Sequence, residues 1–318
     1  MRFGMGKLAF VFPGQGAQKV GMGKDFCEQY DVAKKLFKEA DEALGYSIQG
    51  LCFEGPAEEL ILTANTQPAI LTMSVIAYEI LKEHGIQPEI VGGHSLGEYS
   101  ALVAAGVMKF QDAVMLVHKR GQFMQEAVPV GEGSMAAIIG LSDDVILDAC
   151  EKSTKEAGAV QAVNFNCPGQ TVIAGTAKGV ERAVALLTEA GAKKAVILPV
   201  SAPFHSTLMK PAAEKLAAEL DKVELSDAAV PVAANVNGKL EQTASEIKAN
   251  LVAQADHPVK WIDCVTAMRE YGADVFVEAG PGKTLCGFNK RIDRKLTSMN
   301  VENLETLQKT LDYFKEVR

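Results

Sequence analysis

The segment GHSLG at residues 93–97 constrains the fold more than any other part of the sequence, because it places a serine between two glycines. It follows the short buried-strand pattern PEIVGG (88–93) and leads into LGEYSALVAAG (96–106), which has the pattern of a helix. A G-x-S-x-G segment between a strand and a helix is typical of a nucleophile elbow. Side chains two residues before and after the serine would collide at so sharp a turn, and glycine removes them. The pattern therefore predicts that the Ser95 hydroxyl is held away from the sheet and exposed.

A simpler interpretation is that Ser95 only caps the helix at 96–106, since serine is favoured at that position. Capping accounts for a serine but not for the glycines on both sides, so we predict that Ser95 is a nucleophile. The first NH groups of the helix have no intrahelical partner and can stabilise a developing oxyanion. The backbone NH of Leu96 is the candidate for this role.

Strands and helices alternate through most of the chain. A strand pattern at 7–12 ends at the turn PGQG, and helical spacing at 25–44 and 68–84 ends at Gly45 and Gly85. This alternation is typical of an α/β fold with a mostly parallel sheet and helices on both faces. Beyond residue 200 the pattern predicts a helix at 206–220, a strand at 230–236, a helix around 258–271, a strand at 273–280 and two terminal helices.

The middle of the chain has a different order of elements, βαββαβ, which is typical of a small ferredoxin-like unit. We therefore expect an inserted subdomain at about 132–199 and a large domain formed by 1–131 and 200–318. The predicted elements are a strand at 134–140, a helix at 143–158, strands at 159–166 and 170–175, a helix at 178–191 and a strand at 193–200.

Composition narrows the class of protein. The net charge of −8 argues against a general nucleic-acid binder. No stretch reaches about 18 uninterrupted apolar residues and the N-terminal apolar run is short, so we expect no membrane span and no signal peptide. The six cysteines include no C-x-x-C pair, which favours reduced thiols in the cytoplasm over a zinc site or disulfides. The basic run NKRIDRK (289–295) is either a solvated helix face or a docking patch for an acidic partner.

A serine nucleophile needs a base, and the sequence offers five histidines. His205 lies between a predicted strand and a helix, where ligands of open α/β sheets bind, so we favour it modestly over His257. Asp256 beside His257 is a weak candidate for a third triad member, and a dyad oriented by a backbone carbonyl stays open. Of the other three histidines, His84 is expected to be a cation at the end of a helix. His94 is expected to be a supporting residue and His118 a structural residue.

Arg120 is the candidate for substrate recognition. It lies in DAVMLVHKRGQFMQ (112–125) on a helical face shared with Ala113, Val117 and Met124, so its side chain should point inward. A buried guanidinium requires an anion, which is either an internal carboxylate or the carboxylate of a substrate.

The loop FPGQGAQ (12–18) lacks the spacing of a phosphate-binding loop, because Lys19 replaces the third glycine of G-x-G-x-x-G. The GK pair at 23–24 does not complete a P-loop, since Gln18 and Asp25 occupy required positions. Because this loop follows the first strand, its backbone NH groups are candidates for completing an oxyanion hole.

Six segments together resemble the malonyl-CoA:acyl carrier protein transacylase family of bacterial fatty acid synthesis, which includes the acyltransferase domains of polyketide synthases. The resemblance runs from about residue 7 to just beyond the GPGK turn, with the motifs in the family's order. It implies an α/β-hydrolase-like large domain that carries a ferredoxin-like subdomain. The segments are FPGQGAQ, GHSLGEYSAL, HKRGQFMQ, NFNCPGQ, APFHSTLMKPA and EAGPGKTLCGF.

The resemblance also implies roles for single residues. Ser95 would be the nucleophile, His205 the base and Arg120 the group that binds the malonyl carboxylate. The backbone NH groups of Gln15 and Leu96 would form the oxyanion hole. Two further positions match family residues: the backbone carbonyl of Gln254 would orient the histidine, and the ring of Phe204 would crowd a 2-methyl group on the substrate.

The implied reaction is ping-pong transfer of malonyl from malonyl-CoA to acyl carrier protein through a malonyl-serine ester, without a metal or nucleotide cofactor. We expect a monomer with no nucleic-acid or membrane partner. Two alternatives remain from the residues alone: a serine hydrolase such as a thioesterase, because an elbow does not select the acceptor, and a non-catalytic subunit that binds the carrier protein.

Overall fold

The computed structural model describes residues 6–200 and 202–317. Within them, six strands form one sheet in the order β10-β9-β1-β2-β7-β8. Every neighbouring pair is parallel except β7 with β8. The strands are β1 (Lys7–Phe12), β2 (Ile90–Gly93), β7 (Val232–Ala233), β8 (Leu240–Glu241), β9 (Ala273–Ala279) and β10 (Thr297–Val301).

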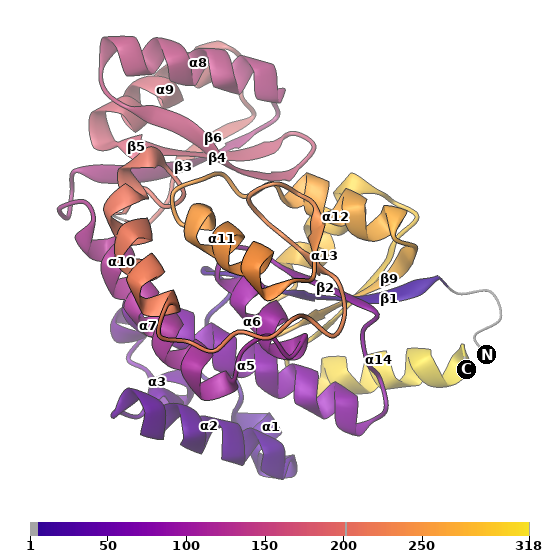
Figure 1. The fold of residues 1–318 in the computed structure, drawn as a ribbon. Helices are drawn as coiled ribbons and strands as arrows, with labels where there is room; N and C mark the ends of the chain where they lie inside the picture. Colours follow the sequence, from indigo (N-terminus) through magenta and orange to yellow (C-terminus); the bar gives the residue numbers. More distant parts are fainter. Residues whose placement is uncertain (1–5, 201, 318) are drawn as a thin grey trace.

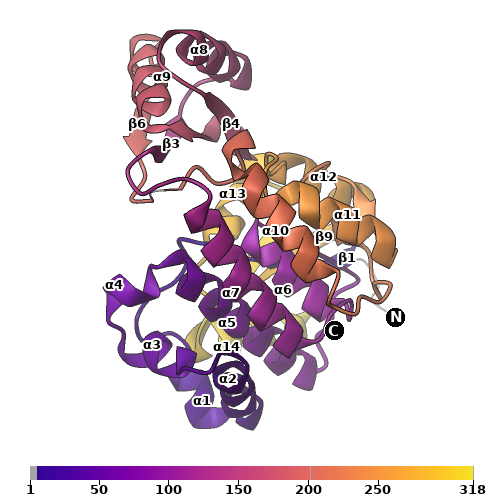
Figure 2. The same ribbon diagram turned by 60° about the vertical axis from the view of Figure 1, so that its left-hand side comes forward.

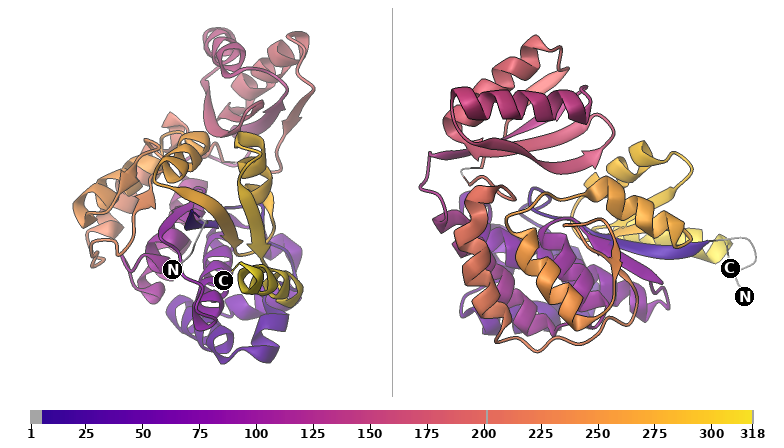
Figure 3. Two further views of the ribbon diagram at one scale, coloured as in Figure 1. Left: turned by 90° about the vertical axis from the view of Figure 1, so that its right-hand side faces the viewer. Right: turned by 45° about the horizontal axis from the view of Figure 1, so that its top comes forward.

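Helices cover both faces of this sheet (Figures 1 and 3). The central strand β1 explains why, because its side chains alternate between two buried clusters. Leu8, Phe10 and Phe12 pack into the larger cluster, and Ala9 and Val11 into the smaller one. The larger cluster is built with α1 (Lys24–Gln29), α2 (Asp31–Leu44), α3 (Ile48–Glu54), α4 (Ala57–Leu60), α5 (Thr63–Glu83), α6 (Leu96–Ala104), α7 (Phe110–Glu126), α10 (Lys210–Leu220), α11 (Ala244–Gln254) and α14 (Leu304–Glu316), and the smaller with α12 (Trp261–Glu270) and α13 (Thr284–Ile292).

A second sheet of four antiparallel strands stands above the first with two helices on its outer face (Figure 2). Its strand order β4-β5-β3-β6 and its βαββαβ sequence are those of a ferredoxin-like unit. The predicted α/β fold class is thus confirmed for both sheets. The elements are β3 (Gly133–Ile139), α8 (Asp143–Glu156), β4 (Val160–Cys167), β5 (Gln170–Thr176), α9 (Ala177–Glu189) and β6 (Lys194–Ile197).

We propose that 132–199 is an inserted subdomain and that 1–131 and 200–318 form the large domain. The proposal is supported by a separate buried cluster inside the small unit, which includes Ile138, Ile146 and Leu187. Residues 1–5, 201 and 318 of these ranges lie outside the described residues.

Backbone hydrogen bonds of strand β4 join the two units. The backbone NH of Phe165 donates to the carbonyl of Val259 at 3.0 Å, and the NH of Val259 donates to the carbonyl of Val163 at 2.7 Å. From the basic run, Arg291 donates to Gln170 Oε1 and to the carbonyl of Pro168, both at 3.0 Å. Arg291 thus fastens α13 to the β4–β5 turn.

Two predicted helices begin or end at the wrong residue. The helix expected at 25–44 is divided at Tyr30, whose backbone is extended, into α1 and α2. The helix expected from Pro68 begins five residues earlier, so proline lies inside α5. Proline has no NH to donate to the carbonyl four residues earlier. That carbonyl, on Ala64, is paired with His118 Nδ1 at 2.8 Å instead, which accommodates the proline and gives His118 a structural contact.

The C-terminal prediction was wrong in one respect, because strand β10 lies between the two terminal helices and forms an edge of the sheet. The helices α3, α4 and α11 and the short strand β8 were not predicted. The strand expected at 230–236 has only two residues, and the one expected at 193–200 ends at Ile197. In the part of the chain that is described, no helix combines the length and apolar character needed to cross a membrane.

Candidate active site

The turn between β2 and α6 has the backbone geometry of a nucleophile elbow. Ser95 has φ 54° and ψ −110°, a conformation that costs free energy in a non-glycine residue. A Cβ on Gly93 would collide with the backbone of Gly97, and a Cβ on Gly97 would collide with the carbonyl of Phe12. Glycine at both positions is therefore required for the strand and helix to approach this closely.

Helix capping does not account for Ser95, because its side chain makes no capping hydrogen bond to α6. Its hydroxyl lies 2.7 Å from His205 Nε2. Its backbone NH donates to Asn235 Oδ1 at 2.7 Å, and Asn235 Nδ2 donates to the carbonyl of Gly93 at 2.7 Å. One asparagine side chain thus holds the backbone of the elbow on both sides of His94.

His205 is placed on the serine by a loop between β6 and the 3-10 turn Thr207–Met209. His205 has a positive φ of 62°. Among the described residues, Ser95 is the only other non-glycine residue with a positive φ. His205 Nδ1 lies 2.8 Å from the backbone carbonyl of Gln254. A carbonyl only accepts, so Nδ1 carries the proton and the lone pair of Nε2 faces the serine hydroxyl. This geometry is that of a dyad oriented by a backbone carbonyl.

Burial and, to a smaller extent, the nearby charge of Arg120 together lower the pKa of His205 to about 3, although the hydrogen bond to the carbonyl of Gln254 opposes them. The imidazole is therefore neutral at physiological pH and able to accept a proton.

This shift predicts the pH dependence of Ser95 acylation if His205 is its base, as the sequence predicts. The kcat/KM for acylation by a thioester substrate should show no acid limb between about pH 8 and pH 5, because the imidazole is already deprotonated there. Arg120→Gln removes the positive charge, so the pKa of His205 should rise and any acid limb should move to higher pH. A stopped-flow pH profile of both proteins checks this, and a wild-type limb at the ordinary histidine pKa would contradict it.

The alternative base is placed elsewhere. His257 Nδ1 lies 2.7 Å from Asp256 Oδ1 and 2.8 Å from the carbonyl of Ala253, and its side chain is 56% exposed. His94 lies beside the site as a supporting residue, with Nε2 2.7 Å from Asn166 Oδ1 on β4. His84 ends α5 and its Nε2 lies 3.0 Å from the hydroxyl of Tyr30.

Arg120 reaches the serine from α7 and is 2% exposed. Its Nη2 donates to Ser95 Oγ at 3.2 Å and to Gln254 Oε1 at 2.9 Å, while Nη1 donates to Gln67 Oε1 at 2.8 Å. No Asp or Glu among the described residues forms an ion pair with it. A buried guanidinium that is held by neutral amides keeps its charge available for an incoming anion.

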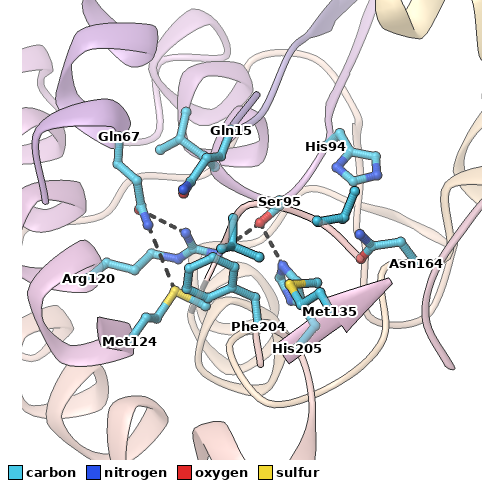
Figure 4. A pocket seen from close by; sticks show the side chains of 13 residues that line it. Gln15, Gln67, His94, Ser95, Arg120, Met124, Met135, Asn164, Phe204 and His205 are labelled. Atoms are coloured by element: carbon cyan, nitrogen blue, oxygen red, sulfur yellow. Dashed lines mark hydrogen bonds between the residues drawn. The ribbon is translucent and has the colours of Figure 1, made fainter. Parts of the chain in front are cut away.

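Ser95, His205 and Arg120 line a cavity of about 120 Å³ (Figure 4). Gln15 and Leu96 belong to it, and within the described residues neither backbone NH donates to a protein acceptor. Both NH groups are therefore available to an oxyanion near Ser95. The rest of the lining is mainly apolar, from Met124, Met135, Leu198, Val200 and Phe204.

Sequence reasoning missed Gln67, Asn235 and Glu98, which surround the predicted residues and are at most 2% exposed. Glu98 carried a usable signal, since it is the one charged residue in the helical pattern at 96–106 and must find a buried partner. Gln67 carried no such signal, because it precedes the residue at which its helix was expected to begin. Asn235 carried none, because it ends a pattern that indicates only a strand.

The fold and the site together resemble one class of protein, the α/β enzymes in which a serine at a strand–helix elbow is hydrogen-bonded to a histidine. More narrowly, the chain belongs to the acyl transferase domain family, whose model matches residues 9–311.

Relatives in this family extend over nearly the whole chain. A malonyl CoA-acyl carrier protein transacylase of Bacillus subtilis is 51% identical over 312 residues, covering 98% of each chain. The crystal structure of an acyl carrier protein S-malonyltransferase from Vibrio cholerae superposes with a TM-score of 0.93 at 48% identity, covering 96% of this chain and 99% of that one. A malonyl-transacylase in complex with its type II PKS acyl-carrier protein superposes with a TM-score of 0.94 at 45% identity, with the same coverage.

Proposed function

We propose that this protein transfers the malonyl group of malonyl-CoA to the phosphopantetheine thiol of acyl carrier protein. The observation that carries the proposal is the guanidinium of Arg120 at 3.2 Å from Ser95 Oγ without a carboxylate of its own. An acyl group bound to this serine is therefore selected by a negative charge at its far end. The relatives named as malonyl CoA-acyl carrier protein transacylases support the same substrate and acceptor.

In the first half-reaction the Ser95 hydroxyl attacks the thioester carbonyl while His205 Nε2 takes its proton. The oxyanion is stabilised by the backbone NH groups of Gln15 and Leu96, and the imidazolium by the carbonyl of Gln254. Collapse of the tetrahedral intermediate breaks the C–S bond, and the imidazolium returns its proton to the leaving sulfur. Coenzyme A departs as the thiol and malonyl remains as an ester on the serine.

The second half-reaction repeats these steps with a different nucleophile. His205 takes the proton of the phosphopantetheine thiol, whose sulfur attacks the ester carbonyl in the same oxyanion site. The proton then passes to Ser95 Oγ as the C–O bond breaks, which regenerates the free enzyme and leaves a malonyl thioester on the carrier protein. A mainly apolar lining disfavours water as the competing nucleophile.

Two further assignments belong to this proposal. The ring of Phe204 in the cavity lining would crowd a 2-methyl branch, which favours malonyl over methylmalonyl. We also assign the protein to the cytoplasm, a compartment consistent with the free cysteines at positions 27, 52, 150, 167, 264 and 286.

The proposal is tested by following label from malonyl-CoA with and without the carrier protein that bears its phosphopantetheine arm. Malonyl should accumulate on the carrier protein far faster than free malonate appears. Release of coenzyme A at the same rate with and without the carrier protein would identify a hydrolase and overturn the transferase assignment.

A further inference from the structure

A group of buried polar side chains contacts Ser95 and Arg120 without lining the cavity, and no step of the proposed reaction uses these side chains. Gln254 is at its centre. Its Oε1 accepts from Arg120 at 2.9 Å, and its Nε2 donates to Glu98 Oε2 at 2.8 Å and to the carbonyl of Ser95 at 3.0 Å. The backbone carbonyl of the same residue orients His205. One glutamine therefore sets the position of both the cation and the base.

Glu98 holds this glutamine in place. It lies in the first turn of α6, three residues after the nucleophile, and is 1% exposed. Its Oε2 accepts from Gln254 Nε2 and, at 3.2 Å, from the backbone NH of Asn235, whose side chain holds the elbow. Glu98 is thus linked to Arg120 through Gln254 and to the backbone of Ser95 through Asn235.

The environment of Glu98 disfavours a charged carboxylate. It makes no ion pair within the described residues, and its Oε1 is buried without a hydrogen-bond partner there. Burial raises the pKa of Glu98 above its ordinary value, and the buried carboxyl of Glu241 on β8 raises it further, against smaller lowering effects of its hydrogen bonds and of Arg120. The other titratable groups that interact with it are Arg120 on α7, Tyr99 on its own helix and Cys264 on α12. Of these only Arg120 is cationic, and its guanidinium is directed to Gln67, Ser95 and Gln254 instead.

We propose that Glu98 is a positioning residue that acts as a neutral carboxylic acid, fixing Gln254 so that Arg120 is aligned but not neutralised. The inference rests on the proposed function, because it explains how an arginine can lie near a buried carboxyl and still be available to the carboxylate of malonyl. An ionised Glu98 would provide a competing negative charge in a region of low dielectric constant and weaken substrate binding. The neutral acid supplies the same acceptor to Gln254 without that charge.

Two substitutions of Glu98 distinguish the effect of its acceptor oxygen from the effect of a negative charge. Glu98→Gln keeps the shape and an acceptor oxygen but has no charge, so kcat/KM for malonyl transfer should remain within about threefold of wild type. Glu98→Met keeps the volume and removes the acceptor. It should lower malonyl kcat/KM by about tenfold, and the ratio of malonyl to acetyl transfer by a similar factor, since Arg120 loses its alignment.

The control is Glu278→Met, which changes another glutamate that is 0% exposed and lies on β9. It should lower the melting temperature without changing the ratio of malonyl to acetyl transfer. If Glu98 acts through Gln254, the ratio should fall no further when Glu98→Met is added to Gln254→Met, a substitution that leaves the backbone carbonyl in place.

Three results would overturn the inference: a tenfold or larger loss of malonyl transfer in Glu98→Gln, an unchanged acyl ratio in folded Glu98→Met, or additive losses in the double variant. Should Glu98→Met not fold, the infrared difference spectrum between wild type and Glu98→Gln decides. The C=O stretch of a protonated carboxyl should be present in wild type at pH 7 and lost in the variant, and a carboxylate band lost instead would overturn the inference. Absence of malonyl transfer by the wild type would overturn the proposed function and the inference together. The results named above overturn only the inference, because they are measured in a wild type that transfers malonyl.

Discussion

Replacing Ser95 by alanine should abolish malonyl transfer to the carrier protein, with a loss of ~10⁴-fold or more in kcat. In the proposed reaction the hydroxyl supplies the atom that carries the acyl group between the two half-reactions, and no neighbouring side chain in the cavity offers a substitute of similar reactivity. The lining contributes amides, thioethers, imidazoles and a guanidinium besides the serine. Transfer is measured as malonyl bound to the carrier protein over time.

The same variant should fold as the wild type does. The hydroxyl makes no capping bond to α6, and the hydrogen bond of the backbone NH to Asn235 is retained in alanine. A melting temperature within a few degrees of wild type, together with an unchanged circular dichroism spectrum, would show that the loss of transfer is chemical. Residual transfer within tenfold of wild type would place the nucleophile at another residue.

Replacing Arg120 by alanine should change acyl selectivity more than any other single substitution. In the proposed function the guanidinium forms an ion pair only with a substrate that has a free carboxylate, and removing one partner of a buried ion pair costs about 3–5 kcal/mol. Malonyl kcat/KM should therefore fall by a factor on the order of 10²–10⁴, whereas acetyl transfer, which makes no such pair, should change only a few-fold.

Competing acylation by malonyl-CoA and acetyl-CoA measures this ratio directly. Arg120→Met, which restores most of the lost volume, is the matched control for the cavity that alanine leaves. Both variants should show the same loss of malonyl preference. Equal losses for the two acyl groups would mean that Arg120 stabilises the site but does not bind the substrate.

The sequence predicts the elbow well because the determining contacts are local. The collisions that exclude a side chain at Gly93 and Gly97 involve residues within the same turn or the end of β1. The βαββαβ unit is predicted for the same reason, since every one of its elements except the last strand, β6, ends at a glycine or a polar turn.

The partners of the serine are harder to predict, because they depend on contacts between distant segments. His205 was only modestly favoured over His257 from its position in the chain, and what distinguishes them is a hydrogen bond to Ser95 across 110 residues. The orienting carbonyl of Gln254 is a backbone group that any residue carries, so no side-chain pattern indicates it and only the family resemblance did. The side chain of Asn235 makes two hydrogen bonds to the backbone of the elbow, and no local sequence pattern predicts them.

The helix boundaries that were wrong have a similar cause. A proline is normally placed at the start of a helix, and α5 departs from this rule because His118 on a neighbouring helix pairs with the carbonyl of Ala64. Strand β10 was missed because its five residues are stabilised as a strand by pairing with β9 and have little alternation of their own.

The most direct test of the account is the mass of the intact protein after brief mixing with malonyl-CoA, before any carrier protein is added. The account predicts a gain of one malonyl group per chain, found on the peptide that contains Ser95 and lost again when the carrier protein bearing its phosphopantetheine thiol is supplied. An unmodified chain, or a malonyl group on a peptide without Ser95, would contradict it.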